Sequence, residues 1–182
     1  MKWIDLNINQ SWTLFLDRDG VINRRLIGDY VKTWDDFVFE NNALNAIADL
    51  SLIFGKIVIV TNQQGIGKGL MNQADLKEIH AKMLNKIKQS GGKIDAVFHA
   101  PKLADDPNNI RKPKPNMAWL AQQQFPQINF KKSIMVGDMP TDMAFATRLG
   151  MIRVAINNEI EADFHYPSLF HFAQHLKQQL KP

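Results

Sequence analysis

The chain has 182 residues, no cysteine and a formal net charge of +4 at pH 7. Its length suits one domain, residues 1–182, and the lack of cysteine excludes disulfides, a thiolate nucleophile and Cys-ligated zinc. The mild positive charge suits an anionic substrate and is too small and scattered to indicate nucleic acid. No run resembles a signal peptide or a membrane span, so we expect a cytoplasmic protein without a membrane partner.

Short apolar runs alternate with amphipathic patterns along the chain. Strands are expected at 3–7 (an edge strand), 13–16, 56–60, 96–99, 133–136 and 152–156. Helices are expected from residue 43 past residue 50 (capped by Asn41 or Asn42), and over 73–89, 116–124, 141–149 and 168–180. This alternation predicts an α/β fold with a mainly parallel sheet.

Polar residues follow four of these strands, where each strand ends: Asp17 and Asp19, Thr61 and Asn62, the loop after His99, and Asp138. Right-handed crossovers bring the carboxyl ends of parallel strands to one edge of the sheet. There the carboxylates of Asp17, Asp19 and Asp138 would repel one another without a cation between them, and hard oxygen ligands suit Mg²⁺. Taken locally, Asp17 and Asp19 could instead be solvated in a surface turn, with Gly20 supplying a positive φ.

Further groups that favour an anion are expected at the same edge. Thr61 and Asn62 offer a hydroxyl and an amide, and Arg111 and Lys112 add positive charge. A metal, hydrogen-bond donors and a fixed cation around one spot indicate a phosphoryl-transfer site. The glycine-rich segment 65–69 lacks the pattern of a nucleotide-binding phosphate loop, and we interpret it as a tight loop before the next helix.

Four segments carry a resemblance to a known family: residues 14–23 around Asp17-Arg18-Asp19-Gly20, 60–63, 111–115 and 136–138. In order and spacing they resemble the four motifs of the haloacid dehalogenase (HAD) superfamily of phosphohydrolases. More narrowly, they resemble the branch with the D-glycero-D-manno-heptose 1,7-bisphosphate and histidinol-phosphate phosphatases. The resemblance covers about residues 14–154. It implies a three-layer, Rossmann-like sheet with helices on both faces, and the short segments between motifs leave no room for a separate cap domain.

The resemblance also implies roles for individual residues. Asp17 resembles the nucleophile that forms an aspartyl-phosphate, and Asp19 resembles the general acid and base. Lys112 resembles the fixed cation beside the nucleophile, with Lys114 as its rival. The metal ligands implied for Mg²⁺ are Asp17, Asp19 and Asp138. The residues implied or considered as contacts to phosphate or substrate are Thr61, Asn62, Arg111 and Asn23.

Several assignments stay open at this point. Asn23 could touch the substrate or only close the turn after Gly20. Asp142 could orient a metal-bound water or cap the helix that contains it, and a direct metal contact is the weaker alternative. The aromatic residues Tyr30, Trp34, Phe37 and Phe39 are expected in the core or as loop anchors rather than as a substrate platform.

Many members of this branch hold a structural zinc in the loop before the third motif, with Cys and His ligands. The corresponding positions here are Ala100, Asn108 and Ile110, so no zinc is expected, and turns and prolines should hold the loop. The expected function is Mg²⁺-dependent hydrolysis of a small phosphorylated metabolite, with a heptose bisphosphate first and histidinol phosphate second. The alternatives are a nucleic-acid-end phosphatase and a non-catalytic phosphate-binding domain. We expect a monomer or a weak homo-oligomer.

Overall fold

The computed structural model describes residues 3–156 and 159–180. Six parallel strands form one sheet in the order β3-β2-β1-β4-β5-β6. They are β1 Thr13–Leu16, β2 Lys56–Asn62, β3 Ala96–Ala100, β4 Ser133–Gly137, β5 Ile152–Ala155 and β6 Phe164–His165.

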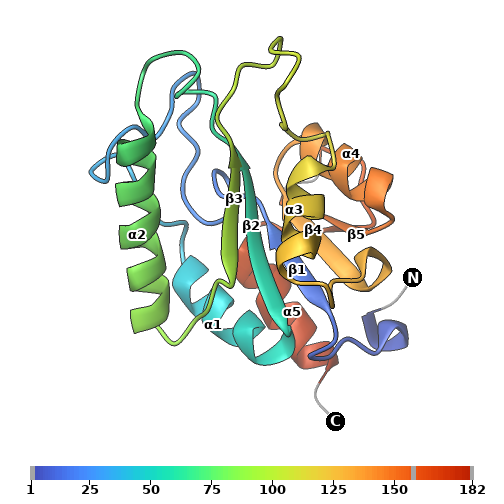
Figure 1. Ribbon diagram of the computed structural model, residues 1–182. Coiled ribbons are helices and arrows are strands. Elements are labelled where there is room, and N and C mark those ends of the chain that lie inside the picture. The colour runs from blue at the N-terminus through green and yellow to red at the C-terminus, as the bar shows by residue number, and fades with distance from the viewer. Residues whose placement is uncertain (1–2, 157–158, 181–182) are drawn as a thin grey trace.

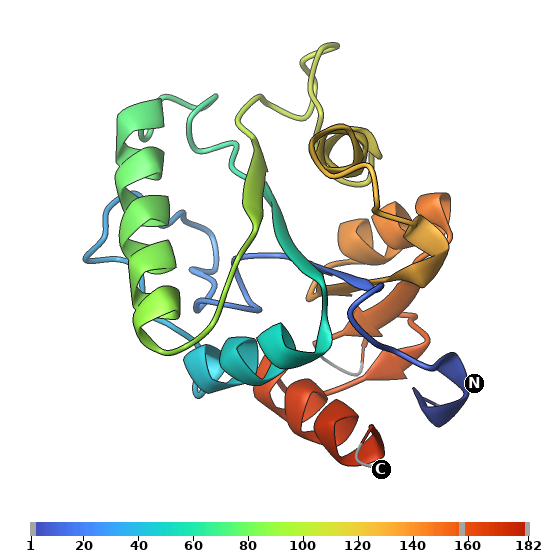
Figure 2. The same cartoon turned by 60° about the horizontal axis from the view of Figure 1, so that its bottom comes forward.

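Five α-helices cover the two faces of this sheet (Figures 1 and 2). They are α1 Ala43–Ile53, α2 Gln73–Gln89, α3 Asn116–Gln124, α4 Pro140–Leu149 and α5 Leu169–Gln179, with short 3-10 helices at Trp3–Leu6 and Phe130–Lys132. One core lies between the sheet and α1, α2 and α5, and a second lies between the sheet and α3 and α4. The three-layer α/β prediction is confirmed. Among the residues described, each helix is too short or too polar to cross a lipid bilayer.

Strand β1 lies in the middle of the sheet, and this position accounts for its continuous apolar sequence. It pairs with β2 on one side and β4 on the other, and all four of its residues are buried. Leu14 and Leu16 pack into the core under α1, α2 and α5, whereas Phe15 packs into the core under α3 and α4. Because both faces of the strand are covered, it is a continuous apolar run without polar alternation.

The chain order creates a switch point beside β1. From β1 the chain passes to β2 and β3 on one side of the sheet, then crosses to β4, β5 and β6 on the other side. The connection after β1 therefore runs to one side of the sheet and the connection after β4 runs to the other. The two leave from the carboxyl ends of these strands, at the upper end of the sheet in Figure 1. Open α/β sheets bind ligands in the crevice at such a point.

The expected edge strand at 3–7 is wrong, because residues Trp3–Leu6 form a 3-10 helix. The Trp3 ring stacks on Phe164, with centroids 3.9 Å apart, and its indole N–H donates to the Tyr166 hydroxyl at 2.8 Å. Trp3 is buried in this conformation, and its N–H has a partner, both of which stabilise the 3-10 helix. The sheet edge is instead β6, a short strand that the sequence pattern did not reveal.

Of the two residues expected to cap α1, Asn42 is the one at its N-cap, but it does not cap through its side chain. Its backbone has φ 59°. Asparagine adopts this left-handed conformation more readily than most residues, which is the reason for an asparagine here. The other helices and strands lie within a few residues of their predicted bounds.

Candidate active site

Asp17 and Asp19 lie in a tight turn at the end of β1. The amide of Asp17 still bonds to the carbonyl of Val136, and the amides of Ile22 and Asn23 then bond to the carbonyl of Arg18. Gly20 has φ 87°, and a Cβ at this position would overlap the Asp138 carboxylate. Glycine is therefore required both by the turn and by the close approach of the fourth motif.

Lys112 lies between two carboxylates at the floor of the site. Its Nζ is 2.9 Å from Oδ1 of Asp17 and 2.6 Å from Oδ1 of Asp142, and all three side chains are at least nine-tenths buried. Lys114, the rival considered from sequence, instead donates to the carbonyl of Asn109 at 2.9 Å. Lys112 is thus the lysine placed against Asp17.

Asn62 joins β2 to the segment that carries Lys112. Its Oδ1 accepts from the Lys112 amide at 2.9 Å, and its Nδ2 donates to the Lys112 carbonyl at 3.2 Å. The Lys112–Pro113 peptide bond is cis. The amide of Asn62 therefore fixes the third motif, while the neighbouring Thr61 lines the cavity.

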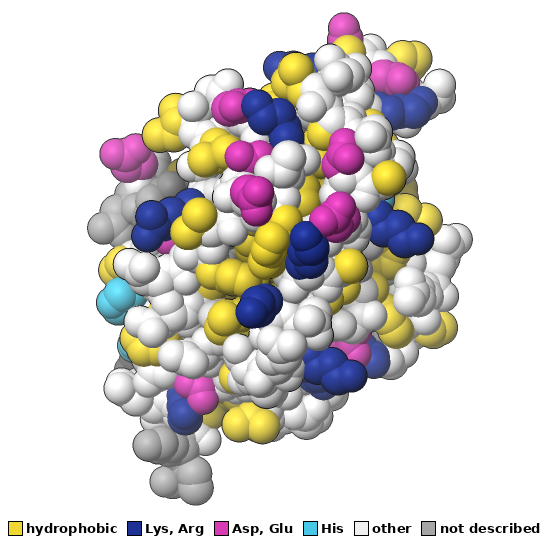
Figure 3. All heavy atoms as spheres, turned by 90° about the vertical axis from the view of Figure 1, so that its left-hand side faces the viewer, with side chains coloured by type: hydrophobic (Ala, Val, Ile, Leu, Met, Phe, Trp, Pro, Cys, Tyr) yellow, Lys and Arg dark blue, Asp and Glu magenta, His cyan; other side chains and the backbone are white. Residues whose placement is uncertain are grey.

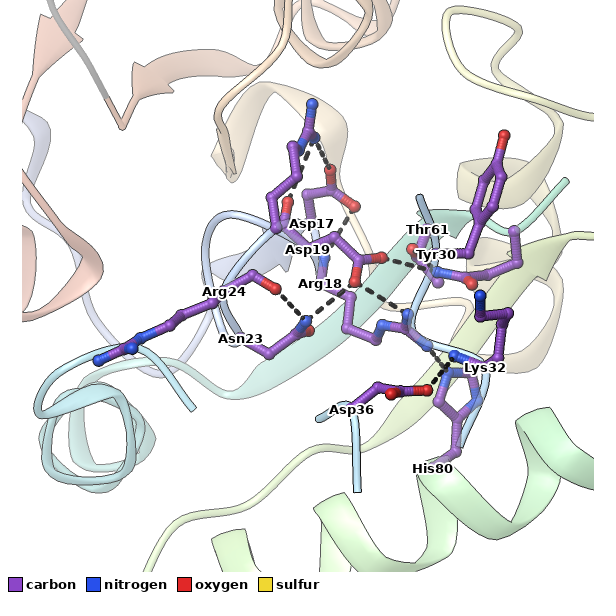
Figure 4. Close-up of polar contacts among 12 residues, drawn as sticks. Asp17, Arg18, Asp19, Asn23, Arg24, Tyr30, Lys32, Asp36, Thr61 and His80 are labelled. Carbon is purple, nitrogen blue, oxygen red and sulfur yellow. Dashed lines mark hydrogen bonds and ion pairs between the residues drawn. The ribbon is translucent and has the colours of Figure 1, made fainter. Parts of the chain in front are cut away.

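The carboxylate of Asp19 is held by three donors. Its Oδ1 accepts from Arg18 NH2 and from Asn23 Nδ2, both at 2.9 Å, and its Oδ2 accepts from Gln63 Nε2 at 2.8 Å (Figure 4). Burial would raise the pKa of Asp19, but the ion pair with Arg18 and the hydrogen bonds together lower it. Asn23 thus closes the turn and holds Asp19, and Gln63 is a contact that the motif reading did not assign.

Two other carboxyl groups of the site, those of Asp17 and Asp138, have raised pKa values. Burial raises the pKa of Asp17 to about 6, with Lys112 opposing and Asp142 adding to the shift. Burial and the charge of Asp17 raise the pKa of Asp138 to about 7, against the effect of Arg25. Burial alone would lower the pKa of Lys112, yet Asp142 and Asp17 raise it. The cluster therefore favours a buried cation.

Oxygen ligands for a divalent cation are present. Carboxylate oxygens of Asp17, Asp138 and Asp142 lie within 4.8 Å of one another. However, Asp142 already has partners on both oxygens, because Oδ2 caps α4 by accepting from the Met139 amide and Oδ1 contacts Lys112. Asp17 and Asp138 are therefore the side chains best placed for a hard cation such as Mg²⁺.

Arg25 touches the same oxygens and was missed by the sequence reading. Its NH2 is 2.7 Å from Asp138 Oδ1, 3.3 Å from the backbone oxygen of Asp19 and 3.9 Å from Asp17 Oδ2. The carboxylate of Asp19 accepts from Arg18, Asn23 and Gln63, whereas the backbone oxygen of Asp19 is the atom that Arg25 contacts. A basic pair, Arg24–Arg25, directly after the acidic turn was the signal that could have revealed it.

A cavity of about 520 Å³ opens above these groups. Its lining includes the acidic turn, segment 25–31, Thr61, Asn62, Gln63, Lys68, Arg111, Lys112, Met139, Thr141 and Asp142. The NH1 atom of Arg111 is buried and has no hydrogen-bond partner among the residues described. A cavity with these cations around an acidic floor suits a phosphorylated ligand with a second anionic group.

Tyr30 belongs to the cavity and differs from the other aromatic residues considered with it. Its hydroxyl accepts from Gln64 Nε2 at 2.8 Å, and Lys68 Nζ lies 5.3 Å from its ring centroid. Trp34 stacks on Phe37, and Phe39 meets both of these rings edge to face. Phe37 belongs to the core, and the other two rings pack against it. Tyr30 therefore joins the 24–39 loop to the 63–69 loop at the mouth of the cavity.

The loop before the third motif is held by side-chain turns. Asn109 Nδ2 donates to the carbonyls of Ala104 and Asp106, and Asp106 Oδ1 accepts from the Asn108 amide. Ala100 is buried at the end of β3, whereas Asn108 is exposed. Asn109 and Asp106 therefore hold turns of this loop through side-chain hydrogen bonds.

Comparison with known proteins gives a consistent picture. The family model of polynucleotide kinase 3 phosphatase matches residues 15–180. The D-glycero-alpha-D-manno-heptose-1,7-bisphosphate 7-phosphatase of Mycobacterium tuberculosis is 39% identical over 138 residues, which are 75% of this chain and 72% of that protein. The D-glycero-beta-D-manno-heptose-1,7-bisphosphate 7-phosphatase of Bordetella bronchiseptica is 35% identical over 137 residues, which are 75% of each chain.

Solved structures agree with these matches. The D,D-heptose 1,7-bisphosphate phosphatase of Bordetella bronchiseptica, complexed with magnesium and phosphate, aligns with a TM-score of 0.84. The alignment covers 92% of this chain and 99% of that one, at 29% identity. The corresponding enzyme of Burkholderia thailandensis aligns with a TM-score of 0.65 at 27% identity, covering 90% and 97%.

Proposed function

Because the chain belongs to the HAD superfamily of phosphohydrolases, among relatives that include the heptose-bisphosphate 7-phosphatases, we propose that it is a Mg²⁺-dependent phosphatase of a heptose 1,7-bisphosphate. One observation carries the proposal: Lys112 Nζ lies 2.9 Å from Asp17, at the switch point of the sheet, with Asp19 and Asp138 alongside. A buried nucleophilic carboxylate with its own cation is what phosphoryl transfer from a dianion needs.

The first half of the reaction uses Asp17 and Asp19. An oxygen of Asp17 attacks phosphorus while the bond to the leaving sugar oxygen breaks, which gives an aspartyl-phosphate. Asp19 donates a proton to that leaving oxygen in those molecules in which it is protonated, although Arg18 and the other donors lower its pKa. Lys112 stays against Asp17 and offsets the negative charge that gathers on the transferring group.

The second half returns Asp17 to its starting state. Asp19 is now ionised and takes a proton from a water molecule, whose oxygen attacks the phosphorus of the aspartyl-phosphate. The bond between phosphorus and Asp17 breaks, and inorganic phosphate leaves. The donors on Asp19, Arg18 and Gln63 among them, stabilise the ionised form that this step requires.

Asp17 and Asp138, with the backbone oxygen of Asp19, would hold Mg²⁺. The ion would supply charge neutralisation at the phosphoryl oxygens. The hard oxygen donors of this set support that choice of metal, and the Bordetella structure with magnesium and phosphate is a relative with the same fold.

The substrate assignment rests on the relatives and on the cations of the cavity. Arg111 and Lys68 also line the cavity and would contact the phosphate that does not react. Thr61, with Asn62, would contact the reacting phosphate. The relatives include enzymes named for both the alpha and the beta anomer, so the anomer is part of what the experiment determines.

A nucleic-acid end is the second candidate, because the matching family model is described as a 3 phosphatase of polynucleotide kinase. A nucleic acid would need a continuous basic track beside the site. On the face over α2 shown in Figure 3, Lys and Arg side chains are interspersed with Asp and Glu. That face therefore offers no continuous basic track for a nucleic acid.

The decisive experiment is phosphate release from a panel of esters, with Mg²⁺ and after metal removal. The panel holds both anomers of the heptose bisphosphate, a hexose bisphosphate, histidinol phosphate and a 3′-phosphorylated oligonucleotide. We expect Mg²⁺-dependent release, fastest from a heptose bisphosphate. Preference for the oligonucleotide or for histidinol phosphate would overturn the substrate, and phosphate binding without any release would indicate a binding domain.

We also propose where the enzyme acts and how many copies of the chain it contains. A doubly phosphorylated sugar does not cross a membrane unaided, because burying its charges in lipid is too costly, so the enzyme must share its compartment. We place both in the cytoplasm, and we propose that residues 1–182 act as one domain in a monomer or a weak homo-oligomer.

A further inference from the structure

Arg18, the residue between Asp17 and Asp19, is a buried charge with few partners. Its side chain is 1% exposed. Its NH2 donates to Asp19 Oδ1 at 2.9 Å, its NH1 lies 3.3 Å from His80 Nε2, and its Nε has no partner among the residues described. The ring of Phe37 lies 6.0 Å from its guanidinium carbon. Two contacts, to Asp19 and His80, therefore fix the guanidinium (Figure 4).

His80 can only be the acceptor in its contact with Arg18. A guanidinium has five N–H donors and no acceptor, so His80 Nε2 must carry no proton. Burial and the neighbouring charge of Arg18 lower the pKa of His80 to about 3, which agrees with a neutral ring. His80 projects from α2, so this helix reaches the acidic turn through Arg18.

The contacts of Asp19 make its two oxygens unequal. Oδ1 accepts two hydrogen bonds, from Arg18 and Asn23, whereas Oδ2 accepts one, from Gln63. A carboxylate oxygen has about two lone-pair directions. Oδ1 is therefore saturated, and Oδ2 keeps one direction for the proton that Asp19 exchanges.

We propose that His80 is a positioning residue for the general acid and base: it holds Arg18 on Oδ1 of Asp19 and so leaves Oδ2 as the oxygen that transfers the proton. This inference rests on the proposed phosphatase function. Without the acceptor on His80, NH1 of Arg18 is buried without a partner, and the guanidinium must turn to find another. Its hold on Asp19 then weakens.

Two substrates with different leaving groups distinguish this positioning role of His80 from a purely structural role. A sugar oxygen needs a proton to leave, whereas p-nitrophenolate is stable without one, and kcat/KM reports the step in which the leaving group departs. For His80→Leu we expect kcat/KM to fall about 10- to 100-fold with a heptose bisphosphate, within the usual contribution of a general acid. With p-nitrophenyl phosphate the fall should be smaller than about threefold.

Two further variants complete the design. His80→Gln keeps an oxygen acceptor for Arg18 and should restore most of the activity on the heptose bisphosphate. His99→Leu is the matched control: His99 lines the same groove of about 420 Å³ beside α2, with its ring 6.0 Å from His80, but its hydrogen bond is to Gln73. This control should match the unmodified protein on both esters.

The outcomes are distinct. Equal losses on both esters, or a His80→Gln variant as poor as His80→Leu, would overturn the role of His80 while leaving the phosphatase in place. An unmodified protein inactive on both esters would overturn the phosphatase and this role together. If His80→Leu does not fold, His80→Ala with added imidazole replaces it. Imidazole should then restore hydrolysis of the heptose bisphosphate selectively, and restoration on both esters alike, or on neither, would contradict the role.

Discussion

At the scale of single residues, the acidic turn after β1 combines groups that would repel one another if they stood alone. Asp17 and Asp138 have raised pKa values, Lys112 is buried between Asp17 and Asp142, and Arg25 contacts the oxygens around them. Such pairing of buried charges is costly in desolvation and is typical of functional sites. Substitutions here should therefore change activity much more than they change folding.

Asp17→Asn should lower kcat by at least about a thousandfold, because the amide is not a nucleophile that can form the acyl-phosphate bond. The fold and the affinity for inorganic phosphate should persist, since the volume of the side chain hardly changes. Steady-state kinetics and calorimetric titration with phosphate check both expectations. Asp49→Asn, at a carboxylate that bonds Gln174 and Lys177 on α5, is the control. Full activity in Asp17→Asn would reject this nucleophile.

Lys112→Ala and Lys114→Ala distinguish the two lysines of the third motif. Removing Lys112 leaves Asp17 without its cation and should lower kcat/KM at least about a hundredfold. Removing Lys114 breaks a contact to the Asn109 carbonyl and should change kcat/KM by less than about threefold. Steady-state kinetics on samples shown by urea unfolding to be folded measure both effects. A larger loss of kcat/KM in Lys114→Ala than in Lys112→Ala would make Lys114 the cation that supports Asp17.

Arg25→Ala should strengthen the binding of Mg²⁺ in the absence of substrate by about tenfold, because the guanidinium contacts the oxygens that a metal would use. Without metal, the same variant should melt at a lower temperature, since Asp17 and Asp138 lose a positive neighbour. Calorimetric titration and thermal unfolding measure these effects. Arg24→Ala is the control, because Arg24 is exposed and points away from the site in Figure 4. Equal Mg²⁺ affinity in both variants would contradict the competition.

At the scale of elements, β1 and α2 position different residues of the site. Strand β1 delivers the carboxylates by its central, doubly covered position, whereas α2 brings His80 to the acidic turn from outside the sheet. The N-terminus of α2 is well capped: Asn72 Oδ1 accepts from the amides of Ala74 and Asp75, and Asp75 bonds back to the Asn72 amide. This capping box fixes where the helix starts.

Asn72→Ala should reduce the free energy of unfolding by about 1 kcal/mol, the usual cost of losing an N-cap side chain. Urea titration measures it. Asn42→Gly is the comparison, because the Asn42 side chain does not cap α1 and glycine adopts its φ of 59° without strain. No stability should be lost there. Equal losses in the two variants would mean that the capping box does not stabilise α2.

At the scale of the whole molecule, the stability of the protein should be linked to Mg²⁺ and pH. A carboxyl whose pKa is higher in the folded state than the ordinary 3.8 costs stability as the pH rises towards that folded pKa. Asp17, with a pKa of about 6, and Asp138, with about 7, both follow this rule in the metal-free protein. His80, with a lowered pKa, works in the opposite direction, so the difference between metal-bound and metal-free samples is the informative quantity.

The rise in melting temperature caused by Mg²⁺ should be larger at pH 8 than at pH 5.5. At the lower pH the metal must displace protons from Asp17 and Asp138, whereas at the higher pH both carboxylates are ionised and ready to bind. Thermal unfolding of protein freed of metal by chelator and gel filtration, with and without added Mg²⁺, checks this. An equal rise at both pH values would exclude these carboxylates as the ligands.

The sequence by itself determined most of the helices and strands, the parallel sheet and the candidate residues at the strand ends, although it missed the 3-10 helix Trp3–Leu6 and strand β6. It could do so because a doubly buried strand must be apolar, and because carboxylates directly after such a strand need compensation. The sequence did not show why Gly20 and Gly137 are glycines: in the folded structure a Cβ at Gly20 would overlap Asp138, and a Cβ at Gly137 would overlap Asp142.

Only the tertiary structure decided which partners meet across the chain. Lys112 and Lys114 are two residues apart, and the choice between them depends on a fold that sets the third motif against Asp17. Arg25 meets Asp138, and His80 meets Arg18, across 113 and 62 positions of sequence. Periodicity and motif spacing carry local information, whereas such long-range contacts follow from the packing of elements whose relative positions no local pattern records.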